Sequence, residues 1–374
     1  MAMPPAAPTS PVSTPSIAGP LSGNITPLSL DLGPLGDKVY VTGAVTGLVF
    51  AQDNATRFVK GDNSSGWDLT NGQVFVQKVD GVLQYFIEVG SYSLPSLGTP
   101  YFSSSSMVPA TFGVVPQAFL KLALADNFSV MAGKLPTLVG AEYTFTFENM
   151  DIFRGLLWNQ EPAVSRGVQV NYTAGPLAFS ASVNDGYYSN RFNWASGSVA
   201  YTIDMENTIS FVGAGNLAHT DYATSATPYF QNNGAIYNLI FTHTAGPWII
   251  TPYVQYSDVS ADAKIGIPHS ASTTGLAVLA SYAVDDFFKI AGRVEYIDTT
   301  GKGSSLAKST NLLFGPDSNA WTFTVTPTYQ YKAFFARAEY SIVAASKTTA
   351  GFAMGPKGTG TSQNRVALET GILF

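Results

Sequence analysis

The chain has 374 residues, of which 12% are charged and 13% aromatic, and it contains no cysteine. The charged fraction is about half of the roughly 25% usual in soluble domains, and without cysteine there are neither disulfides nor thiolate chemistry. A net charge of -6 disfavours a nucleic-acid partner, which requires a basic face. No stretch approaches the ~18 consecutive apolar residues of a membrane-spanning helix. This composition is typical of a transmembrane β-barrel, whose apolar residues occupy alternate positions of many strands.

Residues 1–36 form a segment rich in Pro, Ser, Ala and Thr. Such a composition cannot supply a packed core, so we expect a flexible N-terminal tail. Met1 is not followed by the basic and then apolar stretches of a secretion signal. We therefore interpret the chain as an exported protein whose signal peptide has been removed; a protein that is never exported is the alternative.

From Lys38 onward, short runs of alternating apolar and polar residues come in pairs, and the first pair flanks Asp80–Gly81, a strong signal for a tight hairpin. Sixteen strands are predicted, at residues 38–50, 73–79, 82–92, 114–125, 127–134, 164–174, 177–186, 192–203, 208–217, 234–245, 248–258, 273–284, 287–297, 319–330, 333–344 and 364–374. Prolines lie within the runs 251–256 and 326–331 of two predicted strands, and we expect a local bulge in each.

Short turns alternate strictly with mostly longer loops along the predicted strands. This layout predicts the fold class: all-β, a transmembrane antiparallel up-and-down β-barrel over residues 37–374, with about 16 strands, give or take two. The short turns are expected at the periplasmic side and the longer loops at the extracellular side.

One face of each strand carries almost no charge, and in a lipid-embedded barrel that face points outward. The opposite faces carry Ser, Thr and charged residues. Because about 16 strands enclose a lumen too wide for side chains to fill, we expect a water-filled lumen. The charged residues predicted to line it are Glu88, Lys121, Lys289, Arg293, Glu295, Arg337, Glu339, Arg365 and Glu369.

The longest connection, residues 135–163, is too long and too apolar for a simple exposed tip. Folded into the barrel mouth it would narrow the pore; packed outside against neighbouring loops it would not. Both alternatives stay open at this stage. The candidate constriction residues in this loop are Glu142, Glu148, Asp151, Arg154 and Glu161.

No motif for catalysis, metal binding or a cofactor stands out. The three histidines have no metal-ligand spacing, and neither a phosphate-cradling glycine loop nor a dinucleotide fingerprint is present. A hydrolase would need a serine beside a histidine on neighbouring strands, and His243 near Ser210 or Ser281 is a weak candidate. We therefore expect no enzyme, no cofactor and no metal site.

The last strand places Val366 and Leu368 on one face and Arg365 and Glu369 on the other, and it ends on Phe374. A final strand ending on an aromatic carboxy-terminus is similar to the assembly signal of bacterial outer-membrane barrels. This resemblance implies that Phe374 is recognised by the barrel-assembly machinery.

Residues 132–187 are similar to a known family. AGKLPTLVGAE (132–142), RGLLWNQEP (154–162), GVQVNY (167–172) and VNDGY (183–187) resemble the OmpL-like β-barrel porins. Those proteins carry a similar G-K/R-x-P-T-x-x-G-x-E run, followed by a leucine-rich segment and a strand ending in N-x-G. The matching positions are Gly133, Lys134, Pro136, Thr137, Gly140, Glu142, Asn184 and Gly186. The resemblance implies an outer-membrane channel without a cofactor.

The sequence thus predicts an outer-membrane porin that lets ions and small hydrophilic solutes diffuse passively. Outer-membrane lipid and these solutes are the expected partners, and a homo-oligomer is an open alternative. A non-conducting barrel that sheathes a partner or uses its surface for interactions is the rival interpretation.

Overall fold

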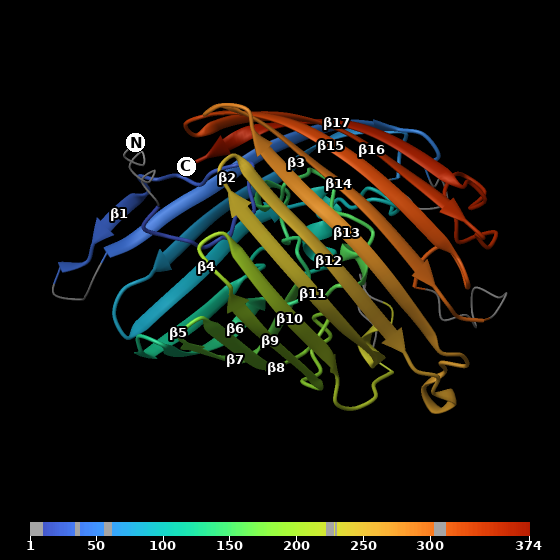
Figure 1. The fold of residues 1–374 in the computed structure, drawn as a ribbon, viewed down its shortest axis with the longest axis horizontal. Coiled ribbons are helices and arrows are strands. Elements are labelled where there is room, and N and C mark those ends of the chain that lie inside the picture. Colours follow the sequence, from blue (N-terminus) through green and yellow to red (C-terminus); the bar gives the residue numbers. More distant parts are fainter. Residues whose placement is uncertain (1–9, 34–37, 56–61, 222–227, 229, 303–311) are drawn as a thin grey trace.

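The computed structural model describes residues 10–33, 38–55, 62–221, 228, 230–302 and 312–374. Its strands form one curved antiparallel sheet that closes into a barrel (Figure 1). The strands are β1 (Leu28–Asp31), β2 (Lys38–Gln52), β3 (Ser65–Lys78), β4 (Leu83–Tyr92), β5 (Ala118–Ala125), β6 (Phe128–Pro136), β7 (Val164–Ala174), β8 (Leu177–Asn184), β9 (Trp194–Thr202), β10 (Asn207–Asn216), β11 (Gly234–Ala245), β12 (Trp248–Val259), β13 (Ala271–Ala283), β14 (Phe288–Thr299), β15 (Asn319–Tyr331), β16 (Phe334–Ser346) and β17 (Ser362–Leu373).

Helices are few and short in the described ranges. They are α1 (Ser104–Ala110) and the 3-10 helices η2 (Thr146–Glu148), η3 (Trp158–Gln160), η4 (Gln231–Asn233) and η5 (Ala263–Ile265). None of the helices in the described residues has the length and apolar character needed to cross a bilayer.

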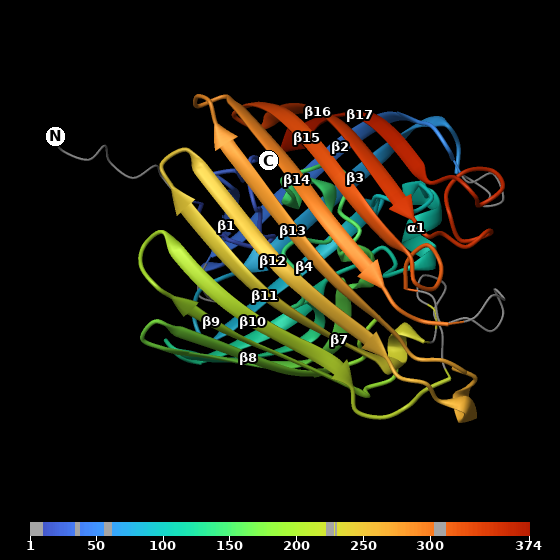
Figure 2. The same cartoon turned by 45° about the vertical axis from the view of Figure 1, so that its right-hand side comes forward.

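The ring consists of β2 to β17, each paired antiparallel with its neighbour in sequence, and β17 pairs with β2 to close it. The predicted 16-stranded barrel is confirmed. Connections of two to four residues alternate with longer ones, so the barrel has a short-turn end and a long-loop end. The long-loop end, with α1, lies at the right of Figure 2. β3 begins at Ser65, earlier than predicted, because the register shift between Thr46 and Gly47 breaks the regular alternation there.

An additional strand, β1, pairs with the first residues of β2 at the short-turn end. It lies within the segment that the sequence predicts to be a flexible tail. Next to it, the chain end joins the same strand: the amide of Phe374 donates to the carbonyl of Gly43 at 3.0 Å, and the amide of Gly43 donates back at 2.8 Å. β1 and the C-terminal residue therefore share the edge of β2.

The predicted division of strand faces agrees with the exposure of the side chains. On β17, Val366 and Leu368 are about half exposed on the outer surface, whereas Arg365 and Glu369 point inward and are buried. The same alternation holds on β14 and β16. An apolar outer band is what lipid contact requires, since hydrocarbon cannot solvate polar groups.

The predicted bulges at the two strand prolines are wrong. The register between β11 and β12 is the same on both sides of Pro252, and that between β15 and β16 is the same on both sides of Pro327. Each proline lacks an amide donor, so the ladder loses bonds locally without gaining an extra residue.

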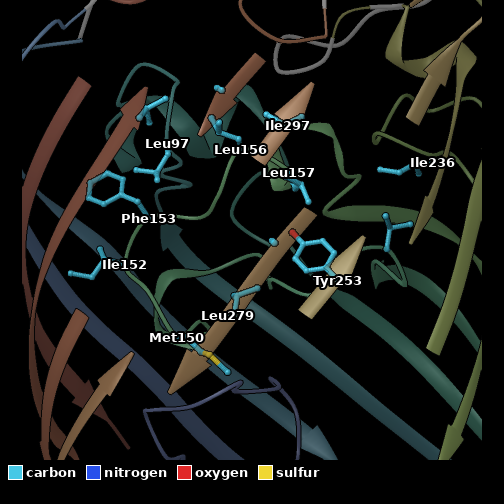
Figure 3. Close-up of a cluster of buried hydrophobic side chains, with 14 of the residues drawn as sticks. Leu97, Met150, Ile152, Phe153, Leu156, Leu157, Ile236, Tyr253, Leu279 and Ile297 are labelled. Carbon is cyan, nitrogen blue, oxygen red and sulfur yellow. The ribbon is translucent and has the colours of Figure 1, made fainter. Parts of the chain in front are cut away.

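The buried apolar core lies inside the barrel. Residues of the β6–β7 connection, including Met150, Phe153 and Leu157, pack against wall residues such as Tyr253 and Leu279 (Figure 3). A second cluster lies toward the short-turn end and includes Phe75, Phe86, Phe145, Phe147 and Leu21. The lumen is therefore partly filled by protein.

Candidate functional site

The candidate site is the β6–β7 connection, residues 137–163, which lies inside the barrel along the wall from β11 to β17; we call it the inner loop. Of the two alternatives left open by the sequence, the structure has the loop inside. Local bonds shape it: Glu148 accepts from the amide of Phe145 at 2.8 Å and so caps η2, and Asn149 bonds both the amide and the carbonyl of Tyr143.

Arg293 on β14 is the main ionic anchor of the inner loop. Its guanidinium lies 2.6 Å from the carboxylate of Glu142 and 3.7 Å from that of Asp151, both in the loop. Its Nε lies 3.3 Å from Glu295 on the same strand, and its NH2 donates to the carbonyl of Phe153 at 3.0 Å. All four charged side chains are buried, and a buried charge is tolerated only when it is paired in this way.

Arg337 on β16 forms a second anchor. It pairs with Glu369 on β17 at 2.6 Å and donates to the loop carbonyls of Thr146 at 2.7 Å and Asn149 at 3.0 Å. Glu369 in turn accepts from the hydroxyl of Thr146. The Arg337–Glu369 pair on the barrel wall therefore holds the inner loop by hydrogen bonds to its backbone and to Thr146.

Two wall carboxylates accept hydrogen bonds from amides of the inner loop. Glu339 on β16 accepts from the amides of Ile152 and Phe153. Glu295 accepts from that of Leu156 at 3.0 Å. Charge-assisted bonds of this kind are stronger than neutral ones, and here they satisfy amides that the loop itself leaves unpaired.

The residues predicted to line the pore all lie on inner faces, but most do not face open water. Seven of them are at most 3% exposed, because the inner loop or neighbouring side chains cover them: Glu88, Arg293, Glu295, Arg337, Glu339, Arg365 and Glu369. Arg365 donates to the carbonyls of Ser96 and Thr99 in the β4–β5 connection. Only two are partly open: Lys121 borders a cavity, and Lys289 donates to the carbonyl of Pro20.

The five candidate constriction residues are buried as well. Glu142 and Asp151 belong to the Arg293 cluster, and Glu148 caps η2. Arg154 donates to the carbonyl of Thr144 at 2.6 Å and lies over the ring of Trp158 at 4.4 Å. Both carboxylate oxygens of Glu161 are buried without a hydrogen-bond partner in the described structure, and burial raises its pKa well above the ordinary value.

The sequence predicts Ser and Thr as well as charged residues on the inner faces, but the pore-lining residues named from it were all charged, so the opposite wall was not singled out. From β6 to β13 the inner face is uncharged, and hydroxyl and amide groups dominate its middle; the signal was present in the Ser and Thr series of these strands. Its polar members include Gln169, Asn171, Ser180, Ser182, Ser196, Ser198, Thr208, Ser210, Thr242 and Thr251. Among the described strands, charged residues on inner faces are thus confined to β2–β5 and β14–β17.

Two cavities border the inner loop, and a third lies away from it near the turns that follow β3 and β5. One of about 530 Å³ opens at the long-loop end between Trp158, Tyr187 and the β4–β5 connection. One of about 400 Å³ lies between the loop and the uncharged wall at Ser210, Thr242 and Thr251. The third, of about 900 Å³, lies at the short-turn end and is lined by side chains such as Gln84, Lys121, Asn127, Asn171 and Thr173.

The equilibrium between the inner loop bound to the barrel wall, which we call seated, and the loop released from it should depend on pH. Burial raises the pKa of Glu148 to about 8, while Arg154 and the amide of Phe145 oppose the rise; Glu88 of β4 and Tyr143 also face it. A released Glu148 would ionise near 4.5, so the seated loop holds more protons between pH 4.5 and 8. Seating therefore weakens as pH rises through this window. Burial also raises the pKa values of Glu142 and Asp151, which act in the same direction.

We expect amides of residues 143–156 to exchange hydrogen more slowly at pH 6 than at pH 9, after correction for the intrinsic exchange rate. Glu148→Gln should reduce this difference, because its side chain cannot ionise. Equal protection at both pH values in the wild type would show that these carboxyl groups do not control seating.

The described residues contain no group of three or more potential metal-ligating side chains. His243 bonds Asn207 at 2.8 Å across the neighbouring strands, on the outer face. Neither Ser210 nor Ser281 pairs with it, since both lie on inner faces. The histidine–serine arrangement that would suggest a hydrolase is therefore not formed.

Solved structures of outer-membrane channels share this fold. The anion-selective porin from Comamonas acidovorans is 12% identical, with 90% of this chain and 99% of that chain covered and a TM-score of 0.61. The channel DcaP of Acinetobacter baumannii is 10% identical, with coverages of 91% and 99% and a TM-score of 0.59. OmpF of Salmonella typhi, solved with daunomycin, is 14% identical, with coverages of 93% and 100% and a TM-score of 0.57. At these identities the likeness shows the fold alone.

Comparison with curated proteins gave no match. The family described as "Putative beta-barrel porin-2, OmpL-like" matches residues 38–374, which is the whole barrel from the first residue of β2 to Phe374. This confirms the resemblance seen in residues 132–187 and extends it over all sixteen strands of the ring. The chain belongs to the OmpL-like β-barrel porin family and is a protein of the bacterial outer membrane.

Proposed function

We propose that the protein is a passive diffusion pore whose path, in the middle of the lumen, runs between the inner loop and the uncharged wall. The observation that carries this proposal is the position of the three cavities, at the two ends and the middle of the lumen. The middle cavity adjoins hydroxyl groups of Ser210, Thr242 and Thr251, which can exchange hydrogen bonds with water and with hydrophilic solutes.

The inner loop would set the width of the path, because it fills the other side of the lumen. The charges beneath it are largely paired with one another, so their fields cancel at short range. We therefore expect weak ion selectivity and passage of small neutral solutes such as sugars or polyols as well as ions. The fold and the family are those of a channel, and we propose no enzymatic activity.

The first test is the single-channel conductance of the detergent-purified protein in a planar bilayer at stepped salt. We expect discrete steps whose size scales with salt, and a reversal potential near zero in a salt gradient. The same measurement is made on the wild type and on a variant that lacks residues 10–23 of the N-terminal segment. If both fold and insert but neither conducts, the proposal is overturned in favour of a scaffold barrel.

The proposed function also implies partners of the barrel. The final strand would be recognised by the barrel-assembly machinery through Phe374. The lipid-facing band would contact lipid or a second copy of the chain in a homo-oligomer. Cross-linking of the protein in native membranes distinguishes a monomer from an oligomer by the mass of the product.

A further inference from the structure

Residues 14–22 cross the lumen at the short-turn end. The carbonyl of Thr14 accepts from Gln77 on β3 at 2.6 Å, and a Cβ placed on Gly19 would lie only 3.3 Å from Ile249 on β12. β3 and β12 lie on opposite sides of the ring, because eight strands separate them in one direction and six in the other. A segment that reaches both walls must pass through the middle of the lumen.

The segment is bonded to a third part of the wall beyond Gly19. Lys289 on β14 donates to the carbonyl of Pro20 at 2.6 Å. The amide of Ser22 donates to Gln330 on β15 at 2.8 Å, and the Gln330 amide group donates back to the carbonyl of Ser22 at 2.9 Å. Both wall side chains come from the inner faces of their strands at the short-turn end.

The middle of the segment rests on the inner loop. The amide of Ala18 donates to the carbonyl of Glu148 at 2.7 Å. Ile17 and Ala18 pack against the apolar clusters in the lumen, and Leu21 is only 3% exposed. Ile17 and Ala18 also border the middle cavity, so the segment covers this cavity toward the short-turn end.

The segment is attached in a way that permits release. Prolines at 11, 15 and 20 lack amide donors, so these residues cannot join the sheet as a strand. Its bonds to the wall are few and isolated, and elements with few contacts open at lower free energy than the sheet around them. Its downstream end is held by β1, which keeps a released segment tethered to the barrel.

Resting on the proposed pore function, we propose that residues 10–23 are a built-in plug that closes the short-turn end of the pore. The seated plug restricts passage between the middle cavity and the periplasmic opening. Displacement of the plug opens this passage without any change in the sixteen strands.

The absence of cysteine allows a reversible lock. In the double variant Ser22→Cys with Gln330→Cys, a short reducible bis-thiosulfonate reagent would tie the plug to β15. We expect the cross-linked protein to have the lowest conductance, and reductant to return it to the level of the same double variant before cross-linking. Deletion of residues 10–23 should raise unitary conductance about twofold or more, because the plug spans a lumen that side chains alone cannot fill. In each of the two single-cysteine variants, the conductance before and after the reagent and the reductant should be the same.

A second variant guards against a folding defect in the deletion. Lys289→Met with Gln330→Leu removes two anchors but keeps the whole chain, and it should raise conductance in the same direction. The position of the plug can also be measured without conduction, by labelling Ala18→Cys with a bulky maleimide. Labelling should be slow when the anchors are intact and fast after they are removed.

The outcomes separate the two proposals. Equal conductance of the cross-linked, wild-type and deleted proteins would contradict the plug but not the pore. Immediate labelling of Ala18→Cys in a protein with all its anchors intact would do the same. If none of them conducts, including the deletion, the pore itself is wrong and there is nothing for the segment to gate.

Discussion

Arg293→Met should release the inner loop and lower the free energy of unfolding by about 3–5 kcal/mol, the usual cost of removing one partner from a buried ion pair. The variant leaves Glu142, Asp151 and Glu295 buried together without their shared cation. Repulsion among three carboxylates favours states in which water reaches them. We expect faster proteolysis within residues 143–156, noisier or larger single-channel currents, and a lower midpoint in urea for the barrel in lipid vesicles.

Two comparison variants separate loop release from general damage. Lys289 lies on the same strand and face, but its ammonium group donates to Pro20 and Ser22 of the N-terminal segment rather than to the inner loop, so Lys289→Met should leave the inner loop protected. Adding Glu142→Gln to Arg293→Met removes one of the unpaired charges and should recover part of the stability. A loop that stays protected in Arg293→Met, with only a shifted reversal potential, would mean that Arg293 faces open water.

The faces of the strands could be predicted because lipid imposes a strict rule on one of them. Val366 and Leu368 must face hydrocarbon, which forces Arg365 and Glu369 inward, whatever the rest of the chain does. The alternation of turns and loops is equally local, since the sequence of a few residues specifies each tight turn. The sixteen strands therefore followed from short-range patterns.

What covers the inner faces could not be predicted in this way. Glu142 meets Arg293 across 151 positions of sequence, and no local pattern marks such a partner. One signal was present: the inner faces carry buried arginines, and the longest connection carries an excess of carboxylates. If the loop folds into the barrel mouth, which was one of the two open alternatives, its carboxylates lie across from the basic residues of the lumen, but the sequence could not decide between the two positions of the loop.

The N-terminal segment shows the limit of composition as evidence. Its prolines and small residues predict a flexible tail because they cannot form a core of their own. They can, however, complete a core that sixteen strands already provide, as Leu21 does. The four residues of β1 were missed for the same reason, since the exposed edge of β2 supplies the pairing that so short a strand lacks.

Gly43→Val should abolish closure of the barrel. Gly43 lies where β2 meets the chain end, and an added Cβ would lie 2.3 Å from the ring of Phe374 and 2.8 Å from the carbonyl oxygen of Gln73 on β3. The ring could rotate away, but the β3 backbone could not move without breaking the ladder. An aromatic ring that covers a strand glycine also shields the backbone around it from lipid. The variant should lose both this cover and the two hydrogen bonds to Phe374.

The measurement is the yield of folded barrel, read from its altered gel mobility without heating, after expression in cells and after refolding in detergent. Gly43→Val should fail in both, because the collision is in the folded barrel. Gly47→Val, on the same strand and face but with its nearest atom at 3.7 Å, should fold in both. Phe374→Ala should refold in detergent yet assemble poorly in cells if the assembly machinery reads the ring. Normal assembly of Phe374→Ala in cells would instead restrict the role of the ring to packing over Gly43.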